Sequence, residues 1–338
     1  MADLTTRWLG LSLKNPVVVG AGPMSQDPDT ARMAVDAGAG AIVMHSLFEE
    51  QVAEEQMAAH LLIDALADHD AEAGGFLPAG AFSMDGDSYL ADLAALKAAV
   101  SVPVVASLNG ISTGGWTSYA VKLTDAGADA LELNLYDIAT DPSEDAAAVE
   151  ARQAALVAEV VRAVAVPVSV KLAPTYTALP AFVTRLRDVG AQGVTVFNRL
   201  FDPRVDLDTL EVQRHLDLST PADLPSRLHA LAILSARVPG LSLACSGGIH
   251  SGRNAAQAIA CGADVVHVTS ALLAHGPTRI GAIVTGLRDM LDGAGYDTAD
   301  ALRGILNLDR APDPAAWTRL NYVRTLDGWR SILNGGPE

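Results

Sequence analysis

The chain has 338 residues, of which half are hydrophobic but only 5% are aromatic, and its formal net charge is −17. This composition favours a parallel sheet buried beneath helices over a β-sandwich. The negative charge argues against nucleic acid or an anionic membrane as the main partner, because either would need a basic surface.

The predicted elements begin with a short hairpin at 4–16, LTTRWLGLSLKNP, which we expect to close the floor of a barrel. A longer excursion at 200–220 is expected to cover a site, as long loops at the carboxyl ends of barrel strands usually do. Ala-rich, helix-like stretches separate eight strand-like segments, at 17–20, 41–44, 103–107, 130–134, 167–171, 193–196, 241–245 and 264–268.

A recurring phrase organises these elements: DAGAGAIVM (36–44), DAGADALEL (125–133), DVGAQGVTV (188–196) and ACGADVVHV (260–268). In each copy a helix ends at a left-handed Gly and a short apolar strand begins. Eight such strands without a break in composition predict an α/β chain folded as a single (β/α)8 TIM barrel over residues 1–338. The competing architecture is an open doubly wound sheet, which the lack of GxGxxG after the first strand disfavours.

Two cysteines, Cys245 and Cys261, both lie in apolar contexts. We expect buried free thiols rather than a redox pair, and no zinc or iron–sulfur centre. The N-terminus MADLTTRWLG does not resemble a secretion signal, and no run of 18 apolar residues occurs. The sequence therefore predicts a soluble, cytoplasmic protein.

The carboxyl ends of the predicted strands carry the candidate site, because barrel enzymes build their sites on that face. Amides and a lysine occupy several of these ends, at Asn109, Asn134, Lys171 and Asn198. Lys171 follows the β-branched run VPVSV, so its ammonium is expected over the barrel mouth, facing an anion or an electron-rich ring. The alternative is a lysine that snorkels to solvent.

The glycines of CSGGIHSG (245–252) precede a predicted helix near Ser251. Gly247 and Gly248, with Thr269 and Ser270, therefore predict a phosphate-binding cradle between strands seven and eight. Amides and a cation beside such a cradle suit flavin mononucleotide (FMN). The amides match the donors and acceptors of the ring, and the lysine stabilises the charge added by two-electron reduction.

Several segments together resemble the class 1 dihydroorotate dehydrogenases and their relatives, including the flavin domain of dihydropyrimidine dehydrogenase, over nearly the whole chain. They are LKNPVVVGAGP, ADALELNL, VPVSVKLAP, the strand end at Asn198, and CSGGIHSGRNAAQAIACGADVVHVTSAL. The resemblance implies a TIM barrel with FMN at its mouth. It implies flavin contacts for Asn134, Lys171, Gly247, Gly248, Thr269 and Ser270, positions near the ring for Ala21, Gly22 and Ser46, and contacts with both flavin and substrate for Asn109 and Asn198.

The substrate half of the site departs from the family pattern. In LELNLYDIAT (131–140), Asp137 stands where class 1 enzymes have a catalytic Cys, and the following Pro and Asn are also replaced. His45 replaces a family lysine, Arg199 replaces a small hydroxyl residue, and AGAFSMDGDSYL (79–90) shows no asparagine-rich orotate-binding segment. An ordinary aspartate, with a pKa of ~3.9, is a weak base near neutral pH.

The sequence thus predicts an FMN-dependent oxidoreductase that acts on CH–CH groups. It would transfer a hydride between flavin N5 and a small substrate other than dihydroorotate, with Asp137 and Lys171 as the catalytic residues. The alternatives are an authentic dihydroorotate dehydrogenase of pyrimidine biosynthesis and a flavin-binding protein without turnover. The acidic charge disfavours a barrel that reduces tRNA uridines. The expected partners are a small-molecule substrate and, in a homodimer, a second copy of the chain.

Overall fold

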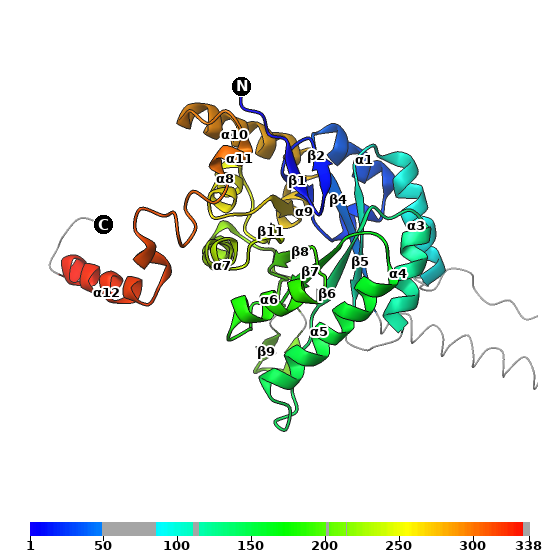
Figure 1. Ribbon diagram of the computed structural model, residues 1–338, viewed down its shortest axis with the longest axis horizontal. Helices are drawn as coiled ribbons and strands as arrows, with labels where there is room; N and C mark the ends of the chain where they lie inside the picture. Colours follow the sequence, from blue (N-terminus) through cyan, green and yellow to red (C-terminus); the bar gives the residue numbers. More distant parts are fainter. Residues whose placement is uncertain (49–85, 111–114, 201–202, 214, 334–338) are drawn as a thin grey trace, which may run out of the picture.

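The computed structural model describes residues 1–48, 86–110, 115–200, 203–213 and 215–333 (Figure 1). Its centre is a closed barrel of parallel strands in the order β11-β12-β3-β4-β5-β6-β7-β8. These strands are β3 (Val17–Val19), β4 (Ala41–Phe48), β5 (Val104–Asn109), β6 (Ala130–Leu135), β7 (Val168–Leu172), β8 (Gly193–Val196), β11 (Ser242–Ser246) and β12 (Val265–Val268). The predicted (β/α)8 barrel is confirmed, and each predicted strand overlaps an observed one.

The helices pack around the outside of the barrel (Figure 1). They are α1 (Pro28–Asp36), α3 (Gly86–Ala99), α4 (Gly115–Asp125), α5 (Ala146–Ala163), α6 (Leu179–Asp188), α7 (Leu224–Arg237), α8 (Gly252–Ala260), α9 (Ser270–His275), α10 (Arg279–Ala294) and α11 (Ala299–Leu302). A further helix, α12 (Leu320–Leu333), lies on an arm away from the barrel. No helix among the described residues is long and apolar enough to cross a membrane.

The repeated phrase has the local structure that was predicted for it. Its four glycines, Gly38, Gly127, Gly190 and Gly262, have φ angles from +98° to +120°. This left-handed conformation favours glycine, and it turns the chain from the end of a helix into the next strand. The alanine that follows each glycine is buried against the core. The phrase is therefore the helix-to-strand corner of the fold.

The floor of the barrel is closed by the predicted N-terminal hairpin, formed by β1 (Thr6–Trp8) and β2 (Leu11–Leu13). Trp8 is fully buried in a cluster with inward-facing aliphatic residues of the barrel strands. Its ring meets the His267 ring edge-on, with 5.4 Å between centroids. The hairpin thus fills the amino-terminal end of the barrel axis.

The excursion after β8 carries a second hairpin, formed by β9 (Arg204–Asp206) and β10 (Glu211–Gln213). Within the part of 200–220 that is described, residues 216–219 form part of the wall of the cavity at the barrel mouth, as expected of a covering segment. Residues 79–85 of the segment compared with an orotate-binding loop lie outside the described residues.

Both cysteines are free and buried, as predicted. Burial raises the pKa of the Cys245 and Cys261 thiols to about 12. Neither is a reactive thiol, because the thiolate is the reactive form and it is scarce at neutral pH.

Candidate active site at the barrel mouth

A cavity of about 500 Å³ opens at the carboxyl ends of the strands. This volume lies in the usual range for a pocket that binds a small molecule or cofactor. Its walls include every residue predicted to bind a cofactor: Ala21, Gly22, Ser46, Asn109, Asn134, Lys171, Asn198, Gly247, Gly248, Thr269 and Ser270. The closed barrel has therefore brought strand ends that are far apart in the sequence onto one concave surface.

Two asparagine side chains of this wall are buried, and not all of their polar atoms have a hydrogen-bond partner in the part of the chain that is described. Asn109 and Asn134 are 6% and 4% exposed, and they lie side by side in the register of β5 and β6. Among the described residues, the buried Asn134 Oδ1 has no hydrogen-bond partner. An unpaired buried carbonyl is costly, so this atom fits a ligand that presents an N–H group.

Lys171 is 6% exposed and reaches the cavity from β7. Its Nζ lies 3.7 Å from Oε1 of Glu132, a fully buried carboxylate on β6. Thr195 donates a hydrogen bond of 2.9 Å to the other oxygen of Glu132. This geometry disfavours the snorkelling alternative, because the ammonium is held against a buried counter-charge instead of in solvent.

A layer of polar side chains lies inside the barrel beneath the mouth. His267 on β12 is 2% exposed, and its Nδ1 is 3.8 Å from Glu132 Oε2. Burial lowers the pKa of His267 to about 4, with Lys171 adding to the shift and Glu132 opposing it. The imidazole is therefore neutral at physiological pH, and the described residues offer neither of its nitrogens a hydrogen bond.

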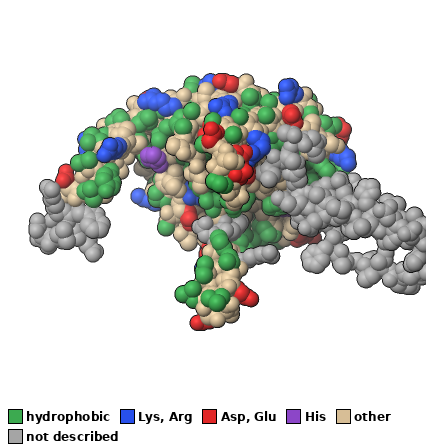
Figure 2. Space-filling model, turned by 90° about the horizontal axis from the view of Figure 1, so that it is seen from below, with side chains coloured by type: hydrophobic (Ala, Val, Ile, Leu, Met, Phe, Trp, Pro, Cys, Tyr) green, Lys and Arg blue, Asp and Glu red, His purple; other side chains and the backbone are tan. Residues whose placement is uncertain are grey.

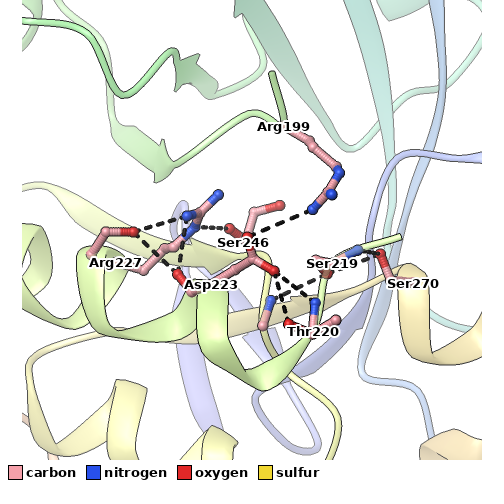
Figure 3. Close-up of polar contacts among 9 residues, drawn as sticks. Arg199, Ser219, Thr220, Asp223, Arg227, Ser246 and Ser270 are labelled. Carbon is pink, nitrogen blue, oxygen red and sulfur yellow. Dashed lines mark hydrogen bonds and ion pairs between the residues drawn. The ribbon is translucent and has the colours of Figure 1, made fainter. Parts of the chain in front are cut away.

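The turn after β11 has the backbone of a phosphate-binding loop. Gly247 and Gly248 have φ angles of +98° and +82°. A Cβ on Gly248 would lie 2.7 Å from the backbone nitrogen of Leu224, so no side chain fits there. Ser219 links this turn to the start of α9: its hydroxyl accepts a hydrogen bond from Gly248 N–H at 3.3 Å and donates one to Ser270 Oγ at 2.9 Å (Figure 3).

His45 lies inside β4, at a shift in the strand's register, and it lines the cavity. Its backbone N–H donates to Ser25 Oγ at 2.7 Å, and Tyr89 donates to its carbonyl at 2.7 Å. Burial lowers the pKa of His45, and Asp92 opposes that shift. A largely neutral ring thus stands where the sequence comparison expected a lysine.

Asp137 is placed differently from the other predicted residues. Its carboxylate Oδ2 lies 2.6 Å from Nη2 of Arg152, a residue of α5 that also pairs with Glu144. Tyr136, one residue earlier, lines the cavity, whereas Asp137 is not among the described residues that do so. The carboxylate is therefore paired with a guanidinium, and neither residue belongs to the described cavity lining.

A model of the dihydroorotate dehydrogenase family matches residues 3–291. The chain belongs to this family. Dihydroorotate dehydrogenase A (fumarate) of Lacticaseibacillus paracasei is 32% identical over 187 residues, covering 50% of this chain and 60% of the relative. The catalytic subunit of dihydroorotate dehydrogenase B (NAD(+)) of Methanosarcina acetivorans is 27% identical over 311 residues, covering 88% and 94%.

Members of the dihydroorotate dehydrogenase family use FMN and act on CH–CH bonds, so this protein is a flavin-dependent oxidoreductase with FMN as its cofactor. The observed site fits that group on three counts. The unpaired Asn134 oxygen suits a ring N–H, Lys171 supplies positive charge at the mouth, and the crowded Gly248 turn allows a phosphate to approach backbone N–H groups.

Sequence reasoning missed five members of the site. Ser219 and Arg227 come from the excursion and from α7, Phe197 follows β8, and Glu132 and His267 lie within strands. All but Glu132 line the cavity. Glu132 and His267 could have been found from the alternation of side chains along a strand. Each lies two positions before a predicted site residue, and so faces the same side of the sheet.

Proposed function

We propose that this protein transfers a hydride between FMN in the barrel-mouth cavity and a small substrate that is not dihydroorotate. The observation that carries the proposal is the contrast between the two halves of the site. The predicted cofactor residues line the cavity, whereas Asp137, at the base position, pairs with Arg152 outside that lining.

On the cofactor side, Asn109, Asn134 and Asn198 would hold the ring, and the Gly247–Gly248 turn would hold the phosphate. When bound, FMN supplies N5 as the hydride acceptor or donor. Lys171 would place a buried positive charge near the ring, where it would stabilise the negative charge added by reduction. Glu132, 3.7 Å from that ammonium, supplies its counter-charge from the neighbouring strand.

On the substrate side, oxidation of dihydroorotate requires a base beside the carbon that loses its proton. A general base must reach that proton directly or through one water. Because the carboxylate of Asp137 is paired with Arg152, we expect this protein to oxidise dihydroorotate poorly. The Asn109, Asn198 and Tyr136 side chains would then line a pocket for a different reducible or oxidisable CH–CH substrate.

The second candidate is dihydroorotate oxidation itself. The family match over residues 3–291 and the names of the relatives favour it. Under this alternative, Asp137 would leave Arg152 and turn toward the substrate. The two candidates therefore differ in what Asp137 does.

Anaerobic reduction of the purified protein by dihydroorotate, followed through the flavin absorbance, tests the proposal. We expect slow reduction in the wild type and no further loss in Asp137→Asn. Because a general base contributes roughly 10²–10⁴ in rate, rapid wild-type reduction that falls by such a factor in Asp137→Asn would overturn the proposal. Glu144→Gln is the matched control, since it removes the other carboxylate on Arg152 and leaves Asp137 in place.

We also propose that two copies of the chain form a homodimer through the β9–β10 hairpin. Aliphatic side chains of this hairpin are exposed, including Val205 (69%), Leu207 (78%) and Leu210 (84%). The hairpin projects from the body, and Figure 2 shows hydrophobic side chains gathered on that projection. Apolar clusters of this kind usually mark protein interfaces.

Light scattering of the wild type and Leu207→Asp measures the assembly. We expect a dimer that dissociates in the variant. Met33→Asp, a change at an exposed apolar residue of α1, is the control and should leave the dimer intact. A monomeric wild type, or a dimer that survives Leu207→Asp, would contradict the interface.

A further inference from the structure

Two arginines of the cavity wall approach Asp223, and we call them the arginine pair: Arg199 after β8 and Arg227 in the first turn of α7 (Figure 3). The guanidinium of Arg227 lies against the glycine turn. A Cβ built on Gly247 would be 3.1 Å from its Nε and 3.2 Å from its Nη2. Both arginines line the cavity, so their positive charge is directed at whatever occupies it.

The Arg227 guanidinium is fixed on one edge. Its Nε donates to the Ser246 carbonyl at 3.1 Å, and its Nη1 donates to the Asp223 carbonyl at 3.0 Å and to Ser226 Oγ at 2.9 Å. In the described part of the chain, its Nη2 makes no hydrogen bond. A guanidinium held in this way is pre-organised, with donor capacity left over.

Arg199 is less well paired. Its Nη1 is 3.8 Å from Asp223 Oδ1, which is beyond hydrogen-bond distance. Its Nε is buried, and no described residue accepts a hydrogen bond from it. The other oxygen of Asp223 accepts from Thr220 N–H at 2.7 Å, so this carboxylate is shared with the 3-10 turn that precedes α7.

Within the described residues, the arginine pair therefore carries more positive charge than its ion-paired carboxylates compensate. Burial lowers the pKa of Arg227, Asp223 opposes that shift, and the neighbouring Arg199 adds to it. Among the described residues, Asp223 is the carboxylate that forms an ion pair with Arg199, and Arg227 forms none. Two partly buried guanidiniums with so little ion pairing among the described residues are stabilised when an anion binds between them.

We propose that the arginine pair, with Arg227 as its main member, binds a phosphate monoester: the terminal phosphate of the flavin cofactor. Guanidinium groups match phosphate oxygens with two donors at once. The Gly247–Gly248 turn lies beside Arg227, and the Ser219 hydroxyl is hydrogen-bonded to that turn. The inference rests on FMN being bound in this cavity. It adds a charged contact, specific to this chain, to the backbone cradle.

Comparison of FMN with riboflavin, which lacks the phosphate, tests the assignment. Protein stripped of flavin is titrated with each, and the dissociation constant is read from quenching of flavin fluorescence. Because a hydrogen bond to a charged group is lost, we expect Arg227→Gln to weaken FMN binding by about 10- to 100-fold. The dissociation constant of riboflavin should stay within about twofold of the wild-type value, because riboflavin has no phosphate for Arg227 to contact.

Three further variants sharpen the result. Arg237→Gln makes the same change on the same helix, at an exposed arginine that pairs with Asp309 at 2.8 Å, and it should leave both constants unchanged. Arg227→Lys keeps a charge without the two-pronged donor, so its loss of FMN affinity should be intermediate. Arg199→Gln should weaken FMN less than Arg227→Gln does, again without affecting riboflavin. Inorganic phosphate should compete with FMN in the wild type more strongly than in Arg227→Gln.

Each contrary result has a distinct meaning. Equal loss of FMN and riboflavin in Arg227→Gln would show that the arginine only supports the fold, and the proposal would fall. Unchanged FMN affinity in Arg227→Gln would also overturn the proposal. If, in addition, carboxylate ligands no longer changed the absorbance spectrum of the flavin in this variant, the arginine pair would be assigned to an anionic substrate. A wild type that binds neither flavin would refute the cofactor assignment itself.

Discussion

The charge pair between Lys171 and Glu132 should set the reduction potential of the bound flavin, and its two members should act in opposite directions. Lys171→Met removes a positive charge beside the ring, and Glu132→Gln removes the negative charge beneath it. Reduction adds negative charge to the flavin. The first change should therefore lower the potential and the second should raise it.

The size of each shift follows from the geometry. Lys171 is buried, so its interaction with the reduced ring is that of a charge-assisted hydrogen bond, about 1–3 kcal/mol. For a two-electron couple, where 1.4 kcal/mol is about 30 mV, Lys171→Met should lower the potential by about 20–65 mV. The rise in Glu132→Gln should be smaller, because Glu132 is not among the described residues that line the cavity.

Stability supplies an independent check on the same pair. Lys171→Met leaves the fully buried Glu132 without its counter-charge, which should cost about 3–5 kcal/mol of unfolding free energy. The double variant removes both charges and should recover most of that loss. Its potential should lie between those of the single variants.

Potentials are measured by anaerobic equilibration with a reference dye, and stabilities by urea unfolding. An unchanged potential in Lys171→Met would return this lysine to a structural role. A lowered potential in Glu132→Gln would contradict the electrostatic account as a whole.

Other positions give further tests. Gly248→Ala places a Cβ 2.7 Å from the Leu224 nitrogen, so it should reduce flavin content and cost about 1–3 kcal/mol of stability. Gly240→Ala, at a similar φ of +89° but in open space, should keep its flavin, and equal flavin loss in both would refute the crowding argument. His267, with a native pKa of about 4 against ~6.5 unfolded, binds fewer protons when folded, so its stabilisation is complete above pH 6.5. Wild-type stability should fall by up to about 3 kcal/mol between pH 6.5 and 4, and His267→Asn should remove that part of the slope in urea unfolding. Trp8→Ala empties the barrel floor and should cost about 3–5 kcal/mol, and a loss below about 1 kcal/mol in thermal or urea unfolding would show that the floor collapses without it.

Much of the site was predictable because the barrel repeats one unit. Once the repeated phrase located the strands, the rule that sites lie at their carboxyl ends placed Asn134, Lys171 and Gly248 on a common surface. The repeat also predicted the left-handed glycines, which depend on local conformation alone. These features are encoded within a few neighbouring residues, so sequence patterns were enough to find them.

The remainder depends on packing between distant segments. Arg227 enters the cavity because the first turn of α7 lies against Gly247, a contact that no local pattern signals. Asp137 was correctly placed after its strand, but its partner Arg152 comes from α5, fifteen positions further along the chain. Sequence reasoning could name the position of that carboxylate and had no means of knowing which side chain would hold it.

The buried Trp8 has a consequence for kinetics. Because its ring packs beneath His267 and fills the amino-terminal end of the barrel axis, the barrel-mouth cavity opens at the carboxyl end. An electron donor and an electron acceptor must then pass through the same opening. If both need the exposed face of the flavin, the oxidised donor has to leave before the acceptor enters. Steady-state measurements with both varied should give parallel double-reciprocal lines, the pattern of a ping-pong reaction.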